Sequence, residues 1–152
     1  FRANEVTEVK SKFPNYPLIK SLSVDGKEYN IHELKERGLI KDDGNRLRIS
    51  LPIPVQPQNN VRVIFTIEKV VRNEDHDSWD VTDKTENMCI LCSRLDGMKV
   101  EAYPIHPEIE EPLKPVLDQG KNIKWELNTG ILPNQGIELS WSFRGDGSQS
   151  DS

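Results

Sequence analysis

The chain has 152 residues, of which 35% are hydrophobic and 30% charged, and its net charge is −5. This length suits one domain that buries a core, and no apolar stretch reaches the roughly 20 residues of a membrane-spanning helix. The excess of acidic residues argues against binding along a nucleic-acid backbone. Two cysteines are too few for a disulfide-rich secreted scaffold.

The chain is expected to begin with a polar, extended N-terminal segment, residues 1–17. Because it starts at Phe1 rather than at Met, we expect another domain or a removed anchor to precede it. Asp25-Gly26 lies between the apolar-patterned stretches SLSV and KEYNI. These two residue types tolerate the positive φ angles of a tight type I′ turn, so the pattern predicts a β-hairpin here.

The stretch NIHELKERG is the one convincing helix pattern in the sequence. Asn30 can cap the first N–H groups, and Glu33 stands three residues further on as its capping-box partner. Tyr29 can pack on Leu34, and Gly38 can end the helix in the left-handed conformation. We expect about two turns, which accompany a sheet rather than form a framework.

Two strand regions follow this helix. A turn at Asp43-Gly44 leads into an alternating apolar pattern at Leu47, Ile49 and Leu51. Pro52 and Pro54 cannot donate ladder hydrogen bonds, so this strand is expected to end or bend at a sheet edge. The strongest strand pattern is VRVIFTIEKVV, with Val61, Val63, Phe65 and Ile67 on one face.

The segment 72–87, RNEDHDSWDVTDKTEN, is predicted to be a polar, acidic loop. An exposed tryptophan beside acidic residues is a plausible anchor for a protein contact. We therefore select Trp79, Asp77 and Asp80 as candidate binding residues, together with Tyr103 beside the PIHP stretch. Packing of Trp79 under its own loop and weak calcium binding by the carboxylates are the alternatives.

Cys89 and Cys92 form the only Cys-x-x-Cys pattern. In a strand, residues three apart point to opposite faces with Cα atoms about 10 Å apart, too far for a disulfide. A zinc site would need two further ligands, and the sequence has no second cysteine pair. We interpret residues 86–105 as a β-hairpin around Asp96-Gly97, with structural thiols on opposite faces.

The remaining sequence predicts a proline-rich extended connection, HPEIEEPLKPVLDQG, and two final strands, NIKWELN and GIELSWSF. Trp125 and Trp141 alternate with polar residues in these strands and are expected in the core, whereas residues 145–152 are expected to be a disordered tail. Seven to nine short strands predict an all-β fold, an antiparallel β-sandwich that is Ig-like in general architecture, with one short helix. It would form a single domain, residues 1–144, and a small β-barrel is the alternative.

The sequence contains no nucleophile elbow, P-loop, dinucleotide fingerprint or His-Glu-x-x-His motif, and we predict no catalytic residue, metal ligand or cofactor. We expect a non-enzymatic interaction or ligand-sensing module that binds a protein or a small molecule. It would be the soluble domain of a larger protein on the cytoplasmic face, with a membrane tether outside this chain as one option. The alternatives are a barrel-like small-molecule sensor with a cavity lined by Phe65, Trp125 and Trp141, and a metal-dependent hydrolase that uses the acidic loop.

Overall fold

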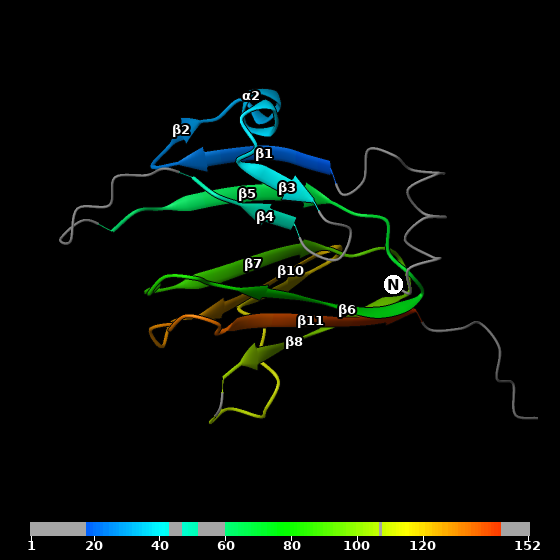
Figure 1. Cartoon of the computed structure of the whole chain (residues 1–152). Helices are drawn as coiled ribbons and strands as arrows, with labels where there is room; N and C mark the ends of the chain where they lie inside the picture. Colours follow the sequence, from blue (N-terminus) through cyan, green and yellow to red (C-terminus); the bar gives the residue numbers. More distant parts are fainter. Residues whose placement is uncertain (1–17, 43–46, 52–59, 107, 144–152) are drawn as a thin grey trace, which may run out of the picture. The chain divides into compact units, whose positions relative to one another are not determined.

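The computed structural model describes residues 18–42, 47–51, 60–106 and 108–143. These residues form antiparallel strands and one short helix (Figure 1), which confirms the predicted all-β class. No helix in the described ranges has the length and apolar content required for crossing a membrane. The predicted segments 1–17 and 145–152 lie outside the described residues.

The contacts within the chain divide it into two compact units, Phe1–Val70 and Val71–Ser152. Each unit has a hydrophobic cluster of its own, and we describe each by itself. The sequence predicted one domain over residues 1–144, and the number of cooperatively folding domains stays a prediction.

The first unit contains a three-stranded antiparallel sheet in the order β2-β1-β5. Its strands are β1 (Leu18–Val24), β2 (Lys27–Glu28) and β5 (Val63–Glu68). The predicted hairpin between β1 and β2 is confirmed, because Asp25 and Gly26 have φ angles of 50° and 81°, the positive pair of a type I′ turn.

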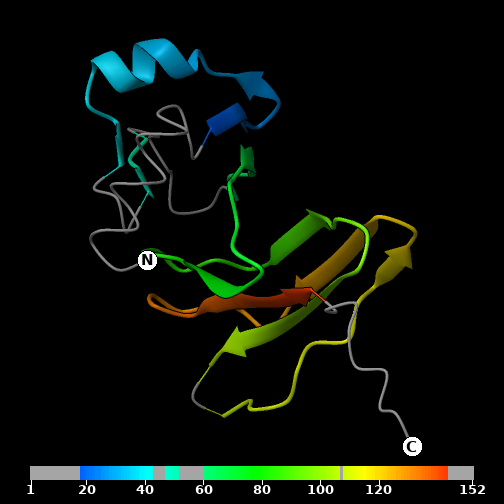
Figure 2. The ribbon, with the colours of Figure 1, turned by 90° about the vertical axis from the view of Figure 1, so that its right-hand side faces the viewer.

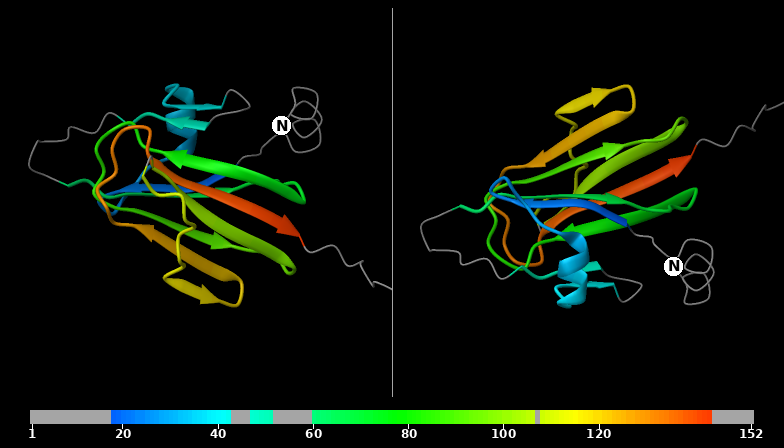
Figure 3. Two further views of the ribbon diagram at one scale, coloured as in Figure 1. Left: turned by 90° about the horizontal axis from the view of Figure 1, so that it is seen from below. Right: turned by 90° about the horizontal axis from the view of Figure 1, so that it is seen from above.

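Helix α2 (Ile31–Glu36) has the predicted Asn30 cap and ends at the predicted Gly38, whereas the Glu33 side chain of the predicted capping box accepts from Arg37 at 3.5 Å. The Asn30 side chain accepts hydrogen bonds from the N–H groups of His32 and Glu33, at 3.0 and 3.3 Å. Gly38, with φ of 67°, ends the helix, and the N–H of the next residue donates to the Leu34 carbonyl at 2.9 Å. This is the Schellman arrangement. Leu34 is buried in the cluster of the first unit, and α2 lies against β1 (Figure 3).

Strands β3 (Ile40–Asp42) and β4 (Leu47–Ile49) form a short antiparallel pair beside this cluster. The predicted turn at Asp43-Gly44, and the two prolines expected to end the strand, lie outside the described residues. Strand β5 is present as predicted, but Val63 and Phe65 remain 45% and 41% exposed, and the cluster covers only Ile67 among its described apolar residues.

The second unit is a sandwich of two open three-stranded antiparallel sheets (Figures 1 and 2). One sheet has the order β6-β11-β8, from Glu74–Asp80, Gly136–Phe143 and Met98–Ile105. The other has the order β7-β10-β9, from Met88–Ser93, Asn122–Leu127 and Leu117–Gln119. The predicted sandwich is therefore confirmed, and the described strands do not close into the alternative small barrel.

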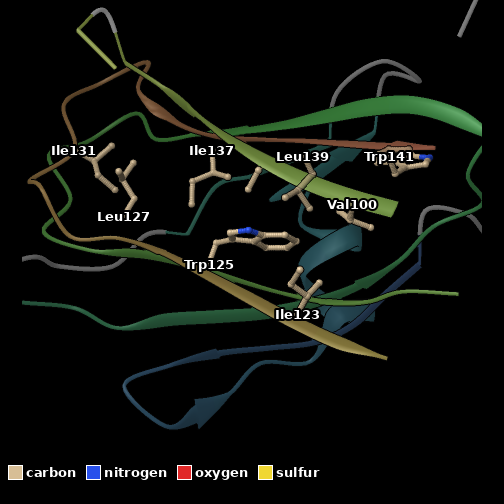
Figure 4. Close-up of a cluster of buried hydrophobic side chains, with 9 residues drawn as sticks. Val100, Ile123, Trp125, Leu127, Ile131, Ile137, Leu139 and Trp141 are labelled. Atoms are coloured by element: carbon tan, nitrogen blue, oxygen red, sulfur yellow. The ribbon is translucent and has the colours of Figure 1, made fainter. Parts of the chain in front are cut away.

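The sandwich core lies between the two central strands, β10 and β11 (Figure 4). Trp125 on β10 is 1% exposed and faces Ile137 and Leu139 of β11. Trp141 is 8% exposed, and its indole N–H donates to the Arg72 carbonyl at 3.1 Å. The prediction that both tryptophans belong to the core is confirmed. An aromatic side chain removes some 150–250 Å² from water, which makes these residues major contributors to the sandwich.

The prediction of a polar loop over residues 72–87 is wrong for its first half, because Glu74–Asp80 form strand β6. The strand pairs along β11, where Asp75 lies opposite Trp141 and Asp77 lies opposite Leu139. The pairing satisfies the backbone hydrogen bonds of a segment whose side chains are too polar to suggest a strand. Partial exposure at the margin of the sheet lets inward-pointing carboxylates remain hydrated.

The predicted hairpin around Asp96-Gly97 is also wrong in its pairing. The strands have the predicted limits, but β7 pairs with β10 in one sheet and β8 pairs with β11 in the other. The chain therefore crosses from one layer of the sandwich to the other at this turn. The core decides this, because the apolar faces of both strands must cover the same interior from opposite sides.

The proline-rich connection is extended over most of its length and closes one side of the sandwich. The Leu113 N–H donates to the Ala102 carbonyl of β8, and the Val116 N–H donates to the Lys124 carbonyl of β10, both at 2.8 Å. The first bond lies at the free edge of β8, and the second continues the pairing of β9 with β10, so the connection passes from one sheet to the other on the side of β8 and β9. After Val116 the connection forms β9, which is the edge strand beside β10 (Figure 3).

Candidate functional site

Another strand can add at the edge of a sheet, and the described strands of the second unit include four edge strands: β6, β8, β9 and β7. Three carry features that discourage strand addition. Strand β6 has the sequence EDHDSWD, with four acidic residues. Strand β8 contains Pro104, and its margin is occupied where Leu113 binds Ala102. Strand β9 is three residues long.

Strand β7, with the sequence MCILCS, is the exception among the described margins of this unit. It contains no charged residue and no proline, and it is six residues long. Its inward-facing residues, Met88, Ile90 and Cys92, pack against the core. On the outer face, Cys89 is exposed and Leu91 is 62% exposed. An apolar strand of this length at a sheet margin is a template for pairing.

The outer face of the β7-β10-β9 sheet is mixed, because the outward residues of β10 between the apolar ones of β7 and β9 are polar or charged. Leu91 lies opposite Lys124, which in turn lies opposite Leu117, so that the three residues form one row across the sheet. Cys89 lies opposite Glu126 in the row beside it. We call Cys89, Leu91 and Leu117 with the margin of β7 the β7 surface.

An ion pair on β10 lies beside these residues. The Lys124 ammonium donates to Glu126 at 2.5 Å. This hydrogen bond, with the nearby Cys89 sulfur, raises the pKa of Lys124, and the hydrogen bonds from Lys124 and Asn128 lower the pKa of Glu126. The two charges of β10 bind each other, and β7 itself has no charged residue.

The two thiols of β7 have different surroundings, as the sequence predicted for residues on opposite faces of a strand. Cys89 is exposed and Cys92 is half-buried, and both are free. Burial raises the pKa of Cys92, and the positive charge of Arg94 opposes this in part. Cys89 is therefore the thiol that reagents can reach from the outer face.

The structure does not bring the four predicted binding residues together. Trp79 and Asp77 lie opposite the buried residues Ile137 and Leu139, so they point to the inner face of their sheet. Tyr103 lies opposite Glu138 on the outer face, and Asp80 is exposed at the end of β6. The binding role of these residues stays a prediction.

Sequence reasoning missed the β7 surface because an apolar stretch with two cysteines reads as core. The available signal was the absence of charge in Met88–Ser93 between the acidic segment before it and Arg94 after it. The absence of charge indicates a strand open to pairing only if the strand lies at the edge of a sheet. The strand order shows that β7 does.

The three residues proposed to line the cavity of the sensor alternative belong to different units, and that cavity stays a prediction. Trp125 and Trp141 pack in the core of the second unit, whereas Phe65 lies on β5 of the first. The second unit does have a groove of about 460 Å³, on the side where the proline-rich connection lies. Its lining includes Arg94, Lys99, Glu101, Asp118, Ile123 and Trp125.

The charged groups at this groove already bind one another. Arg94 pairs with Asp118 and donates to the Gly120 carbonyl, and Lys99 lies 3.1 Å from Glu101. The apolar floor is nearly inaccessible, because Trp125 and Ile123 are 1% and 3% exposed. A ligand would have to break these ion pairs or expose the floor, which makes the groove a weaker site than β7.

Among the side chains that the structure describes, no three His, Cys, Asp or Glu residues converge in a way that could hold a metal ion. The hydrolase alternative therefore finds no support in the described part of β6 and the turn after it. Comparison with known proteins gave no matching family model, no similar curated protein and no similar solved structure.

Proposed function

We propose that this protein is a non-enzymatic interaction module, which binds an extended segment of a protein partner as an additional strand beside β7. The observation that supports this most directly is the contrast between the four sheet margins of the second unit. Only β7 combines a length of six residues with the absence of charge and proline. The outer-face residue Leu91 would contact the side chains of the added strand.

The energetics of strand addition fit this surface. Backbone hydrogen bonds along β7 would supply much of the affinity, and alternate side chains would supply specificity. The cost of ordering the added segment keeps such complexes moderate in strength, so we expect dissociation constants on the order of micromolar. The Lys124–Glu126 pair would border the added strand's contacts without opposing them.

The experiment uses peptides selected from a random library against the immobilised full chain. Leu91→Glu should weaken binding of the selected peptides by about tenfold or more, a loss of about 1.4 kcal/mol. Glu at this position lies opposite Lys124, a pairing that sheets tolerate, so the fold should persist. Leu132→Glu is the matched control, because Leu132 is 54% exposed and lies outside the β7 surface.

N-methylation of the peptide distinguishes strand addition from side-chain contact alone. Methyl groups on alternate amides that face β7 should abolish binding, whereas methyl groups on the intervening amides should have little effect. Equal tolerance of both methylation patterns, or equal loss of binding in the Leu91 and Leu132 variants, would contradict the proposal.

A small-molecule sensor is the second candidate, and the groove beside Trp125 is the observation that favours it. A ligand seated there would displace the Lys99–Glu101 pair and raise the melting temperature of the full chain by mass action. A metabolite panel measured by thermal shift tests this. The Lys99→Ala variant should show a larger shift if the groove is the site, because the ligand no longer has to break the Lys99–Glu101 pair.

A further inference from the structure

We propose that the strand which adds to β7 is the β7 of a second copy of this chain, related by a two-fold axis that passes beside Ile90. This inference rests on the proposed function, because it names the partner of the same surface. It predicts a continuous six-stranded sheet, in which β9, β10 and β7 of one copy are followed by β7, β10 and β9 of the other.

Self-pairing is a stringent condition on a strand, because a two-fold axis brings each residue opposite a residue of the same sequence in reverse order. A pairing of β6 with its own copy, centred on Asp77, would bring Asp77 opposite its equivalent and Glu74 opposite Asp80. Like charges directly opposite one another destabilise a sheet. Strand β7 meets the condition, because none of its six residues is charged.

The faces of the sheet restrict the register. Residues directly opposite each other in an antiparallel pair share a face, so their residue numbers must sum to an even number in a two-fold pairing. Two registers then keep five residues of β7 paired, one centred on Ile90 and the other on Leu91. The Ile90 register places Leu91 opposite Cys89 of the other copy, and Met88 opposite Cys92.

The charges beyond the ends of β7 favour the Ile90 register. Extended by four positions, it brings Glu86 opposite Arg94 of the other copy, which is an attractive combination. The Leu91 register would bring Glu86 opposite Asp96 instead, where the two carboxylates repel. Both registers bring the Leu91 side chains, which are 62% exposed in the single chain, against the other copy, so the charges alone decide between them.

Five paired residues on each copy bury less surface than the roughly 1,200–2,000 Å² of a standard stable interface. The dimer should therefore dissociate on dilution, with a dissociation constant on the order of 10–100 µM. Each copy carries a net charge of −5, and salt screens this repulsion. Association is therefore expected to strengthen as the ionic strength rises.

The first experiment is analytical ultracentrifugation of the full chain over a wide concentration range. A monomer–dimer equilibrium is expected for the natural sequence and for Leu132→Glu. Leu91→Glu should be monomeric throughout, because the two introduced carboxylates would lie diagonally across the new pairing. A natural chain that stays monomeric at the highest concentration would overturn the inference, and so would a dimer that Leu91→Glu leaves unchanged.

The second experiment tests the register by cross-linking with glutathione disulfide as the oxidant. In the Ile90 register, Leu91→Cys places a new thiol opposite Cys89 of the other copy, at a Cα separation of about 4.5–5.5 Å, which a disulfide can bridge. A covalent dimer is expected from this variant. None is expected from Leu132→Cys, or from Cys89→Ser combined with Leu91→Cys.

A covalent dimer from the double variant would overturn the Ile90 register. The peptide experiment separates the two proposals. A chain that never dimerises but binds selected peptides through Leu91 would refute self-pairing and retain strand addition, whereas the loss of both behaviours would refute both.

Discussion

The dipeptide Asp-Gly occurs at two described turns of this protein, and the two turns differ. Asp25-Gly26 has positive φ at both residues and joins two strands that pair with each other, β1 and β2. At Asp96-Gly97 only the glycine has positive φ, 77°. The turn is closed by the Met98 N–H, which donates to the Leu95 carbonyl at 3.1 Å, and it joins strands of different sheets.

The surroundings of the two turns explain the difference. Asp25 is held to the end of β5 by two hydrogen bonds with Arg62, each of 2.8 Å, one through its N–H and one through its carboxylate. Asp96 is 88% exposed at its side chain, and its carboxylate lies 3.5 Å from Lys121. The dipeptide thus permits a tight reversal, while contacts distant in sequence select the turn type and the course of the chain.

Replacing the aspartate by proline should give the largest difference in stability between the two turns. Asp25→Pro forces a negative φ where the chain needs 50° and removes both hydrogen bonds to Arg62, so we expect a loss of about 3 kcal/mol or more in the free energy of unfolding. Asp96→Pro places proline at the second position of a turn whose third residue has positive φ, where proline is favoured. It should change stability by less than about 1 kcal/mol.

Urea unfolding followed by circular dichroism measures both proline variants. All three tryptophans, Trp79, Trp125 and Trp141, lie in the second unit, so their fluorescence reports that unit separately. If Asp25→Pro moves the fluorescence and circular dichroism transitions together, the chain is the single domain predicted from its sequence. Equal losses at the two proline positions would contradict the distinction between the turns.

Replacing the glycine by alanine should cost the same stability at both turns, because both glycines have a left-handed backbone conformation. Gly26 and Gly97 have φ of 81° and 77°, and a Cβ at either position would meet no atom within 4 Å. The cost is therefore backbone strain alone, about 1–2 kcal/mol at each turn. A loss at Gly26 without one at Gly97, measured by the same urea transitions, would show that the second turn has another conformation.

Thiol reactivity, with a smaller expected effect, tests whether Cys89 and Cys92 lie on opposite faces of β7, the strand before the second turn. A maleimide reagent should modify Cys89 in the native protein and Cys92 several-fold more slowly. Since burial raises the pKa of Cys92, its rate should continue to rise at alkaline pH beyond the range of an ordinary thiol. Fragmentation of the tryptic peptide 85–94, which contains both cysteines, distinguishes the two sites by mass spectrometry, and equal native rates would place both thiols on exposed faces.

Much of the fold could be predicted from local patterns. The caps of α2 follow from Asn30 and Gly38, and the strands at Trp125 and Trp141 follow from alternation, because each pattern records contacts between residues close in sequence. The strand at Glu74–Asp80 could not be predicted in this way. Its pairing with β11 compensates for its polarity, and that partner lies about 60 residues away.

The candidate site shows the same limit more sharply. The sequence directed attention to Trp79 and Tyr103, which the fold places on opposite faces of one sheet. It gave no reason to select Leu91, because an apolar residue between two cysteines is usual for a core strand. Leu91 became a candidate only because the structure places it on the outer face of an edge strand.

The sequence by itself determined the class of the fold, the limits of β7 and β8, and the type I′ turn at Asp25-Gly26. Each of these depends on backbone preferences and side-chain periods that act over a few residues. Only the tertiary structure decided that β7 and β8 belong to different layers and that β7 is an edge strand among the described strands of its sheet. Those features depend on which strands share the core around Trp125, and this packing is set by the whole sandwich at once.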